Sequence, residues 1–372
     1  MMSEFKVMLA AGGTGGHVYP AIAIADALVE SGKPVKIDFV GTRERMEWSA
    51  VPRAGYPIHP IWVSGFHRRL TVKNLLFPVK LGVSLLQCYA LLKKHTPDVV
   101  VSCGGFASGP LGWMAGKLKI PLVLQEQNSF PGVTTRKLAG VASRIFIAFE
   151  DARKYFPAEK VELCGNPIRK KITSGDSSKA LADFGLPEGA KTLLILGGSG
   201  GARTINDAIL KNLDSLHHAL GLNIIWQCGG AYYDSLKSGI DRHVYKNLRL
   251  ESFLYNMPQA YAAADLVISR AGALSCSELM ATGKPSILIP SPSVAGDHQA
   301  RNAASMVQKG AARLLKDDEA IGSLTDTVKG VINNEDQLAL MSKAAESLAK
   351  EDAAKLIAEY IIEIAEKRKV RK

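Results

Sequence analysis

The sequence predicts an α/β protein made of two similar halves. The pattern Gly-Gly-x-Gly-Gly occurs at residues 12–16 and 197–201, each time after a short apolar run and before a helical pattern. Glycine permits positive φ angles and lets a backbone approach a ligand closely, and a helix N-terminus behind such a turn offers unpaired N–H groups to an anion. We therefore expect two Rossmann-like, doubly wound domains facing a cleft that holds a phosphorylated substrate.

Short apolar strands alternate with helical patterns in both halves. Runs that are apolar, partly β-branched and bounded by Gly, Pro or polar residues predict strands. These runs are 5–10, 36–40, 99–102, 122–124 and 145–148, then 192–196, 224–227, 248–251, 266–269 and 286–289. Helical patterns such as 21–30 and 81–94 lie between them. The alternation predicts parallel sheets with helices on both faces.

The domain boundaries follow from the linker and from the last helical stretch. A proline at position 167 disfavours helix just before it, so residues 164–167 are the expected linker. We expect an N-terminal domain over 1–165, a C-terminal domain over 166–345, and a C-terminal helix within 346–372 that crosses back to the N-terminal domain. The Ala-rich segment 337–368 is predicted to be helical, and 174–179 to be a polar loop.

Composition excludes several classes of protein. Apolar residues make up 47% and charged residues 22%, as in ordinary soluble enzymes. No run approaches the ~20 apolar residues of a membrane-spanning helix, and no signal peptide is expected because the first residues lead directly into a strand. The five cysteines are scattered without CxxC or zinc spacing, which predicts reduced thiols in a cytosolic protein.

The positive charge is concentrated in the first half. The net charge is +11, and residues 1–165 carry 20 Lys and Arg against 12 Asp and Glu. Within this half, segment 66–81 interleaves bulky apolar residues with basic ones such as Arg68, Arg69 and Lys73. Such a segment is typical of an interface with anionic lipid, although an ordinary helix with one buried face gives a similar pattern. No nucleic-acid-binding module accompanies it, so nucleic acid is not expected as a partner.

His17 is the first candidate for a catalytic residue. It lies where the first glycine turn meets its helix, and the positive end of the helix dipole disfavours a charged imidazolium there. A neutral histidine suits a general base that acts on a hydroxyl. Glu126 is the second candidate, in a polar cluster that directly follows the strand at 122–124, and Asp297 is expected to position groups rather than transfer protons.

Neither a dinucleotide cofactor nor a metal is expected. Both glycine patterns lack the third glycine of the dinucleotide fingerprint, although Asp38 stands roughly where a ribose-binding acid would. The chain has neither HExxH nor Asp-x-Asp, so nothing indicates a built-in magnesium site. Phosphate charge would instead meet turn N–H groups, Ser199, helix dipoles and a cation such as Arg169.

Seven motifs in order resemble one family. They are GGTGGHVYPA, SCGGFASGP, QEQNSFPG, GNPIR, GGSGGAR, SRAGALSCSEL and DHQARNA, and they span about residues 10–310. This set resembles the bacterial N-acetylglucosaminyltransferases that act on undecaprenyl-pyrophosphoryl-N-acetylmuramoyl-pentapeptide, converting lipid I to lipid II in peptidoglycan synthesis. Phe106 stands where that family often has Tyr, which removes any role for a phenol hydroxyl there.

The resemblance implies a B-type glycosyltransferase fold and a reaction without cofactors. The C-terminal domain would hold UDP-N-acetylglucosamine, and the N-terminal domain would hold the lipid acceptor as a peripheral protein on the cytoplasmic membrane face. In this sequence, Glu278 falls on the first turn of its helix, where it could also accept hydrogen bonds from ribose hydroxyls. The substrate-binding residues carried over are Thr14, Gly15 and Gly16 (donor sugar side), Asn128 (N-acetylglucosamine), Arg169 and Ser199 (diphosphate), Phe253 or Leu254 (uracil), Leu274, Ser275 and Glu278 (phosphate and ribose), and Gln299 (sugar hydroxyls).

Two other function classes remain open at this stage. A different sugar transferase or a UDP-N-acetylglucosamine 2-epimerase would share the architecture, but an epimerase would need no lipid acceptor and no membrane patch. A non-enzymatic nucleotide-sugar sensor is disfavoured because three candidate acid–base residues (His17, Glu126 and Asp297) are expected in one cleft.

Overall fold

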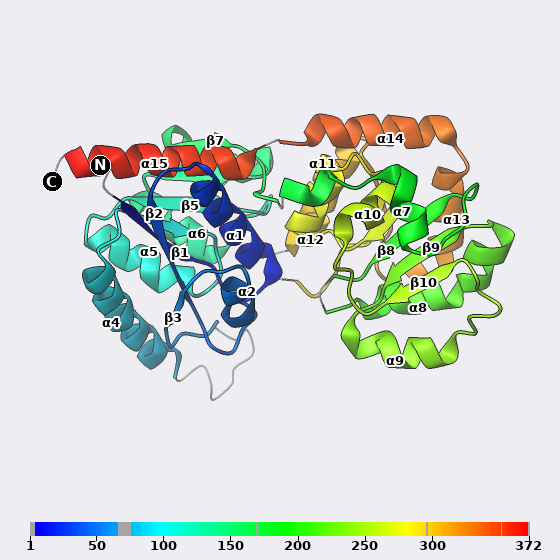
Figure 1. Cartoon of the computed structure of the whole chain (residues 1–372), viewed down its shortest axis with the longest axis horizontal. Coiled ribbons are helices and arrows are strands. Elements are labelled where there is room, and N and C mark those ends of the chain that lie inside the picture. Colours follow the sequence, from blue (N-terminus) through cyan, green and yellow to red (C-terminus); the bar gives the residue numbers. More distant parts are fainter. Residues whose placement is uncertain are drawn as a thin grey trace. The chain divides into compact units, whose positions relative to one another are not determined.

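The computed structural model describes residues 4–65, 76–168, 170–198, 200–294, 297–350 and 352–370. The chain forms two compact units (Figure 1). The first unit comprises Met1–Arg169 and Lys350–Lys372, and the second comprises Lys170–Ala349. Both divisions fall a few residues beyond the expected boundaries at 165 and 345.

The first unit is built on a seven-stranded parallel sheet. The strand order is β3-β2-β1-β4-β5-β6-β7, so the chain winds outward in one direction from β1 and then in the other. The strands are β1 (Phe5–Ala10), β2 (Val35–Gly41), β3 (Ile58–Pro60), β4 (Val99–Ser102), β5 (Leu122–Glu126), β6 (Arg144–Ile147) and β7 (Val161–Leu163). This arrangement confirms the predicted doubly wound sheet.

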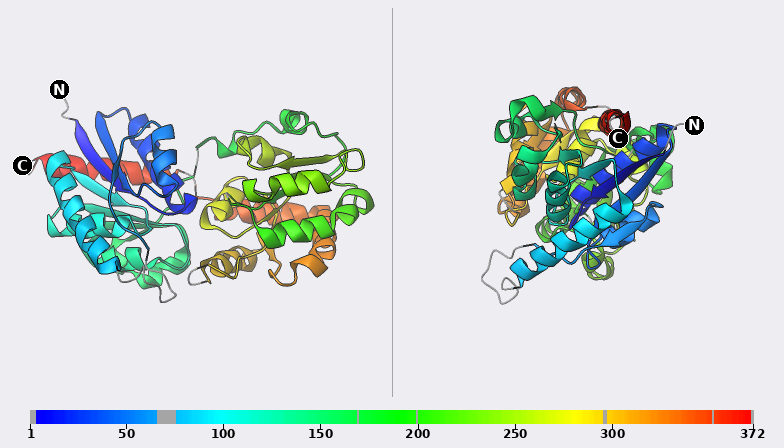
Figure 2. Two further views of the ribbon diagram at one scale, coloured as in Figure 1. Left: turned by 90° about the horizontal axis from the view of Figure 1, so that it is seen from below. Right: turned by 90° about the vertical axis from the view of Figure 1, so that its left-hand side faces the viewer.

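Helices cover both faces of this sheet (Figure 2). One face packs against α1 (Gly15–Glu30) and α15 (Ala353–Val370), with α2 (Glu47–Arg53) beside α1. The other face packs against α4 (Phe77–His95), α5 (Ser108–Lys117) and α6 (Val133–Leu138). Short 3₁₀ turns complete the unit at Ala139–Val141, Glu150–Tyr155 and Ala158–Lys160. The apolar residues of β1 and β4 are buried on both faces, which explains their unbroken hydrophobic sequence.

The second unit repeats this plan on a six-stranded parallel sheet of order β10-β9-β8-β11-β12-β13. Its strands are β8 (Thr192–Leu196), β9 (Asn223–Gln227), β10 (Leu248–Glu251), β11 (Leu266–Ser269), β12 (Ser286–Leu288) and β13 (Ala312–Leu314). Its α-helices are α7 (Ser177–Asp183), α8 (Arg203–Lys211), α9 (Gly230–Gly239), α10 (Met257–Ala263), α11 (Ala273–Ala281), α12 (His298–Gln308), α13 (Ala320–Ile332) and α14 (Glu335–Leu348). A 3₁₀ turn (Lys170–Thr173) opens the unit, and a π-turn (Ser215–Ala219) follows α8.

Two local predictions were wrong. The segment 174–179 is not entirely loop, because α7 begins at Ser177. Asp176 caps this helix: its carboxylate accepts hydrogen bonds from the Ser178 backbone N–H at 3.0 Å and hydroxyl at 2.6 Å. The helical stretch 337–368 is interrupted between α14 and α15, where Asp352 adopts a φ of 59° although no Gly or Pro marks the break.

The residues that the structure describes include no helix of sufficient length and hydropathy to cross a bilayer. Most of the basic-apolar segment 66–81 lies outside the described residues, which resume at Leu76. All five cysteines are buried and free, and burial raises the pKa of each thiol. They are therefore core residues.

Candidate active site

The first glycine turn (residues 12–16) is packed against the glycine-rich loop that follows β4 in the same unit. Gly13 has a φ of 95° and Gly105, in the loop after β4, has a φ of 80°. A Cβ at Gly105 would overlap the carbonyl group of Gly12, and a Cβ at Gly12 would lie 2.9 Å from Cβ of Ala107. The two loops thus meet backbone to backbone, which only glycine allows.

Glu47 holds the first glycine turn in place through hydrogen bonds. Its carboxylate is buried, and Oε2 accepts a hydrogen bond from the Gly13 backbone N–H at 3.1 Å. Oε1 accepts hydrogen bonds from the Thr42 N–H at 3.2 Å and the Thr42 hydroxyl at 2.8 Å. The carboxylate therefore ties the end of β2 to the turn. Sequence reasoning did not find Glu47, because its partner lies 34 residues earlier and no motif joins them.

His17 lies in the first turn of α1, at the carboxyl end of β1. Its Nδ1 lies 3.1 Å from Oγ1 of Thr14, and its backbone N–H donates to the Thr14 carbonyl at 3.1 Å. The imidazole is half-buried against Gly104, where a Cβ would come within 3.1 Å of Nε2. The structure thus brings the predicted base together with Thr14, and Gly104 leaves room for the ring.

The polar cluster expected after the strand at 122–124 begins inside β5, which extends to Glu126, and it is largely internal. Gln125 and Gln127 are buried, and Nε2 of Gln127 donates to the Cys103 carbonyl at 2.8 Å. Nε2 of Gln125 donates to Oδ1 of Asn166 at 3.0 Å, while Nδ2 of Asn166 donates to the Gln127 carbonyl at 3.0 Å. These amides join β5, the loop after β4 and the segment after β7. We expected this cluster to recognise ligand hydroxyls, but these two glutamines bond within the protein.

Glu126 organises the loop that carries Asn128. Its Oε1 accepts hydrogen bonds from the backbone N–H of Asn128 at 3.1 Å and from Nδ2 of Asn128 at 3.3 Å, and its Oε2 accepts one from the Gly132 N–H at 3.1 Å. Burial raises the pKa of Glu126, and hydrogen bonds from Thr135, Asn128 and Gly132 oppose that rise. With both oxygens engaged inside the loop, the carboxylate fits a positioning role better than proton transfer. Asn128 itself is half-buried.

In the second glycine turn (residues 197–201), no carboxylate contacts the glycines that the structure describes. The Gly197 N–H donates to the Gln227 carbonyl at 3.1 Å, and Nε2 of Gln227 donates to the Gly198 carbonyl at 3.0 Å. A Cβ on Gly229 would lie 2.5 Å from Cα of Gly201, so these backbones also touch. Helix α8 follows with Ala202 at its N-cap and no side-chain cap. Its first N–H groups suit a phosphate oxygen.

Helix α11 carries the residues expected at the nucleotide phosphate and ribose. Leu274 and Ser275 are half-buried in its first turn. Glu278 lies in the second turn, not the first as expected, because the helix begins at Ala273. The residue is 5% exposed, and its carboxylate accepts a hydrogen bond from the Tyr261 hydroxyl at 3.1 Å.

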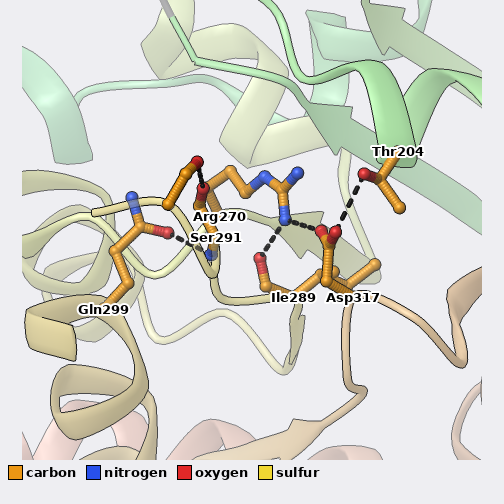
Figure 3. A network of polar contacts seen from close by, with 7 residues as sticks. Thr204, Arg270, Ile289, Ser291, Gln299 and Asp317 are labelled. Atoms are coloured by element: carbon orange, nitrogen blue, oxygen red, sulfur yellow. Dashed lines mark hydrogen bonds and ion pairs between the residues drawn. The ribbon is translucent and has the colours of Figure 1, made fainter.

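A polar network supports the tips of the neighbouring strands (Figure 3). Arg270, just after β11, donates to the Ile289 carbonyl at 3.0 Å and pairs with Asp317. Asp317 also accepts a hydrogen bond from Oγ1 of Thr204, the second residue of α8, at 2.9 Å. Arg270 thereby connects the loops after β11, β12 and β13 to the start of α8. Arg270 lies within the motif SRAGALSCSEL, but no role was predicted for it from the sequence.

The remaining predicted residues are placed as follows. Oε1 of Gln299 in α12 accepts a hydrogen bond from the Ser291 N–H at 2.8 Å (Figure 3). Leu254 is buried, whereas Phe253 is 39% exposed and contacts the Tyr255 ring at 4.9 Å between centroids. Asp297 is exposed at the N-cap of α12. Arg169 and Ser199 lie outside the described residues.

Comparison with known proteins identifies the family. Residues 7–147 match the glycosyltransferase family 28 N-terminal domain, and residues 192–357 match the C-terminal domain of the same family. A protein of Salinibacter ruber named UDP-N-acetylglucosamine--N-acetylmuramyl-(pentapeptide) pyrophosphoryl-undecaprenol N-acetylglucosamine transferase is 42% identical over 364 residues, 97% of each chain. The chain belongs to this family of glycosyltransferases.

Solved structures show the same fold. The crystal structure of Acinetobacter baumannii MurG matches with a TM-score of 0.76 and 28% identity, covering 96% of this chain and 99% of that one. A UDP-N-acetylglucosamine 2-epimerase from Neisseria meningitidis matches with a TM-score of 0.66 and 14% identity, covering 96% of this chain and all of that one. At 14% identity the epimerase shares only the fold. The B-type fold therefore does not separate transferase from epimerase, whereas the 42% identity to named transferases does.

Proposed function

We propose that this glycosyltransferase moves N-acetylglucosamine from UDP-N-acetylglucosamine to the C4 hydroxyl of the N-acetylmuramoyl group of lipid I, giving lipid II. The observation that carries the proposal is the 42% identity, over 97% to 99% of this chain, to transferases of that name. In this scheme the first unit is the acceptor and membrane-associating domain, and the second unit is the UDP-sugar-binding domain. No cofactor or metal takes part.

His17 is the proposed general base. The tautomer with its proton on Nδ1 donates to Thr14 Oγ1 and keeps a lone pair on Nε2, which removes the proton of the acceptor hydroxyl. The positive end of the helix dipole at the start of α1 disfavours a charged imidazolium there, as a base requires. Glu126 acts one step away from the chemistry, because it holds the loop from which Asn128 contacts the acetamido sugar.

The proposed transfer is a single displacement. The donor sugar is α-linked to UDP and the product is β-1,4-linked in this family, so the configuration at the anomeric carbon inverts. Attack by the hydroxyl breaks the bond to UDP through a state with oxocarbenium character. Thr14, Gly15 and Gly16 face the donor sugar in this scheme, beside the base.

The leaving UDP is proposed to be stabilised mainly by the second unit. The N–H groups at the start of α8 and Ser199 meet the diphosphate, together with Arg169, the last residue of the first unit's long segment. Leu274, Ser275 and Glu278 hold the phosphate and ribose, Phe253 or Leu254 packs on uracil, and Gln299 contacts sugar hydroxyls. The Arg270 network keeps the start of α8 in place for this role.

Helix α4 supplies the described part of the proposed membrane-binding face. Val79, Leu86 and Tyr89 are 54%, 71% and 44% exposed, and α4 packs beside α5, which exposes 48% of Trp113. Lys93 and Lys117 lie over the Tyr89 and Trp113 rings at 5.8 and 5.5 Å from the centroids. Exposed aromatic and aliphatic side chains beside lysines suit a peripheral contact with an anionic leaflet, on the cytoplasmic face where UDP-sugars are found.

The activity is tested with purified protein, labelled UDP-N-acetylglucosamine and a short-chain lipid I analogue. We expect a lipid-linked disaccharide and one free UDP for each disaccharide formed. Conversion of the donor to its 2-epimer without use of lipid I would instead establish the epimerase alternative. Donor binding without turnover of either kind would establish the sensor alternative.

Membrane association is tested separately with vesicles of phosphatidylglycerol and phosphatidylcholine. We expect the Leu86→Ser/Tyr89→Ser double variant to bind these vesicles about tenfold more weakly, because it removes exposed apolar area. Val29→Ser is the matched control, since Val29 is also 53% exposed but lies on α1. Equal loss in both variants, or in neither, would contradict the assignment to α4.

A further inference from the structure

Three side chains of the first unit converge away from the glycine turns. They are Asp38 in β2, His59 in β3 and His95, the last residue of α4. One ligand atom from each lies within 4.8 Å of the others, and no other group of three His, Cys, Asp or Glu in the described part of the chain meets this condition. None of the three has a role in the proposed transfer.

The fold itself creates this cluster. Val40 pairs with His59 between the parallel strands β2 and β3. Asp38 lies two residues before Val40, so its side chain points to the same face of the sheet as those of Val40 and His59. Helix α4 covers that face, since its Cys88 and Leu92 share a core with Val40. The helix ends at His95, because Thr96 turns into a left-handed conformation with a φ of 47°.

The polar geometry of the cluster is compact but incomplete. Nε2 of His59 lies 2.7 Å from Oδ1 of Asp38, and Nδ1 of His95 lies 3.4 Å from Oδ2. The Asp38 side chain is only 8% exposed and the His95 side chain 14%. Nε2 of His95, the ring nitrogen other than the one that faces Asp38, is buried without a hydrogen-bond partner, which costs free energy.

We propose that Asp38, His59 and His95 form a binding site for a divalent transition metal ion, with Zn²⁺ as the best fit. Two imidazole nitrogens and one carboxylate are a common zinc ligand set, whereas Mg²⁺ and Ca²⁺ prefer oxygen ligands. Bonds of ~2.0–2.1 Å in a tetrahedral site separate the ligand atoms by roughly 3.3 Å. Nε2 of His59 and Nδ1 of His95 lie 2.7 and 3.4 Å from the two different oxygens of Asp38, and one ligand atom of each residue lies within 4.8 Å of the others, so small side-chain movements would complete a tetrahedral set. Water would complete the coordination.

An ion at this position would take the place of the direct contact between His59 and Asp38, whose Nε2 and Oδ1 atoms lie 2.7 Å apart. Because the ligands come from β2, β3 and the end of α4, the ion would fasten α4 to the edge of the sheet.

The first test uses the tag-free full chain, freed of metal with a chelator and titrated with Zn²⁺ alone. We expect one equivalent to bind by calorimetry. The unfolding midpoint should rise by about 5–10 °C when free Zn²⁺ is ~100 times Kd, with no rise in Mg²⁺. Co²⁺ should give the visible spectrum of nitrogen and oxygen ligands. Absence of stoichiometric binding, or a thiolate charge-transfer band, would overturn the proposal.

Variants locate the ion. His59→Gln and His95→Gln should each weaken Zn²⁺ binding by ~100-fold or more, since each removes one of three ligands. The matched control is the double variant His217→Gln/His218→Gln, which removes an adjacent histidine pair of the second unit whose Nδ1 atoms lie 3.3 Å apart. Zn²⁺ binding that survives in both single variants, or that disappears in the control, would refute the site. The transferase assay plays no part in this test, so the two proposals fail separately.

Discussion

The two glycine turns share one sequence pattern but are held in different ways. The first is braced by the buried Glu47 carboxylate, is packed on Gly105, and leads into a helix that carries His17. The second is held by backbone contacts and the Gln227 amide, and it leads into the uncapped start of α8. The difference matches the proposed roles, in which the first turn positions a reactive side chain and the second unit presents its backbone N–H groups to an anion.

The largest expected effect separates these two roles through His17. We expect His17→Ala to lower kcat by ~10²–10⁴-fold, the usual contribution of a general base. The affinity for UDP should change less than about threefold, because the proposal assigns nucleotide binding to the second unit. Steady-state kinetics and calorimetry with UDP measure the two effects, and His243→Ala, an exposed histidine, is the control. Near-wild-type kcat in His17→Ala would remove the distinction between the turns.

The next effect concerns the backbone contact at the first turn. Gly105→Ala should destabilise the first unit by about 3 kcal/mol or more, because the new Cβ overlaps the Gly12 carbonyl in addition to the strain of a positive φ. Gly32→Ala is the matched control, since its φ is 72° but a Cβ there meets nothing within 4 Å. It should cost only about 1 kcal/mol. Chemical denaturation of both variants checks the contrast, and equal costs would show that strain alone matters.

The brace beneath the first turn gives a smaller effect. Glu47→Gln keeps the side-chain volume but places an amide donor against either the Gly13 N–H or the donors of Thr42. We expect about 2 kcal/mol of lost stability and a several-fold lower kcat. Denaturation and kinetics should be compared with Glu30→Gln, a variant of an exposed residue. Unchanged kcat in a destabilised Glu47→Gln would mean that the brace serves folding only.

The smallest expected effect lies at the second turn. Arg270→Lys retains the charge but cannot bond both the Ile289 carbonyl and Asp317 with the same geometry. Looser placement of Thr204 and the start of α8 should weaken UDP binding about fivefold, with little change in the pH dependence of kcat. Calorimetry with UDP measures this, and Arg203→Lys, at the exposed start of the same helix, is the control. A larger effect on kcat than on UDP affinity would contradict the assignment.

Strands inside the sheets could be predicted from sequence because they are buried on both faces. Strands β1, β4, β8 and β11 have the predicted bounds, as does the edge strand β10, whose four residues also form a partly apolar run. The three strands that the sequence analysis missed, β3, β7 and β13, have only three residues each and lie at sheet edges, where one partner strand suffices and no long apolar run is needed. A local sequence pattern therefore predicts a buried strand better than it predicts a three-residue strand at the edge of a sheet.

Candidate site residues could be predicted where they belong to a motif contained in one loop. His17, Asn128 and Ser275 belong to motifs that fold locally around a strand tip. Glu47 and the cluster of Asp38, His59 and His95 were not predictable as functional groups. The contact of Glu47 with Gly13 and that of Asp38 with His59 arise from strand register and packing between residues that are 34 and 21 positions apart in the chain.

The packing of α15 decides how this chain can be divided. Ile357 and Ile361 of α15 are fully buried in the core of the first unit, together with Leu9 and Ile24. The preceding helix α14 belongs to the second unit, although it ends only a few residues earlier in the chain. A fragment ending at Ala349 would therefore expose the apolar side of α1 and should aggregate. A fragment spanning 170–349 keeps every strand of its own sheet, so the second unit is the one that can be exchanged between relatives as a single continuous segment.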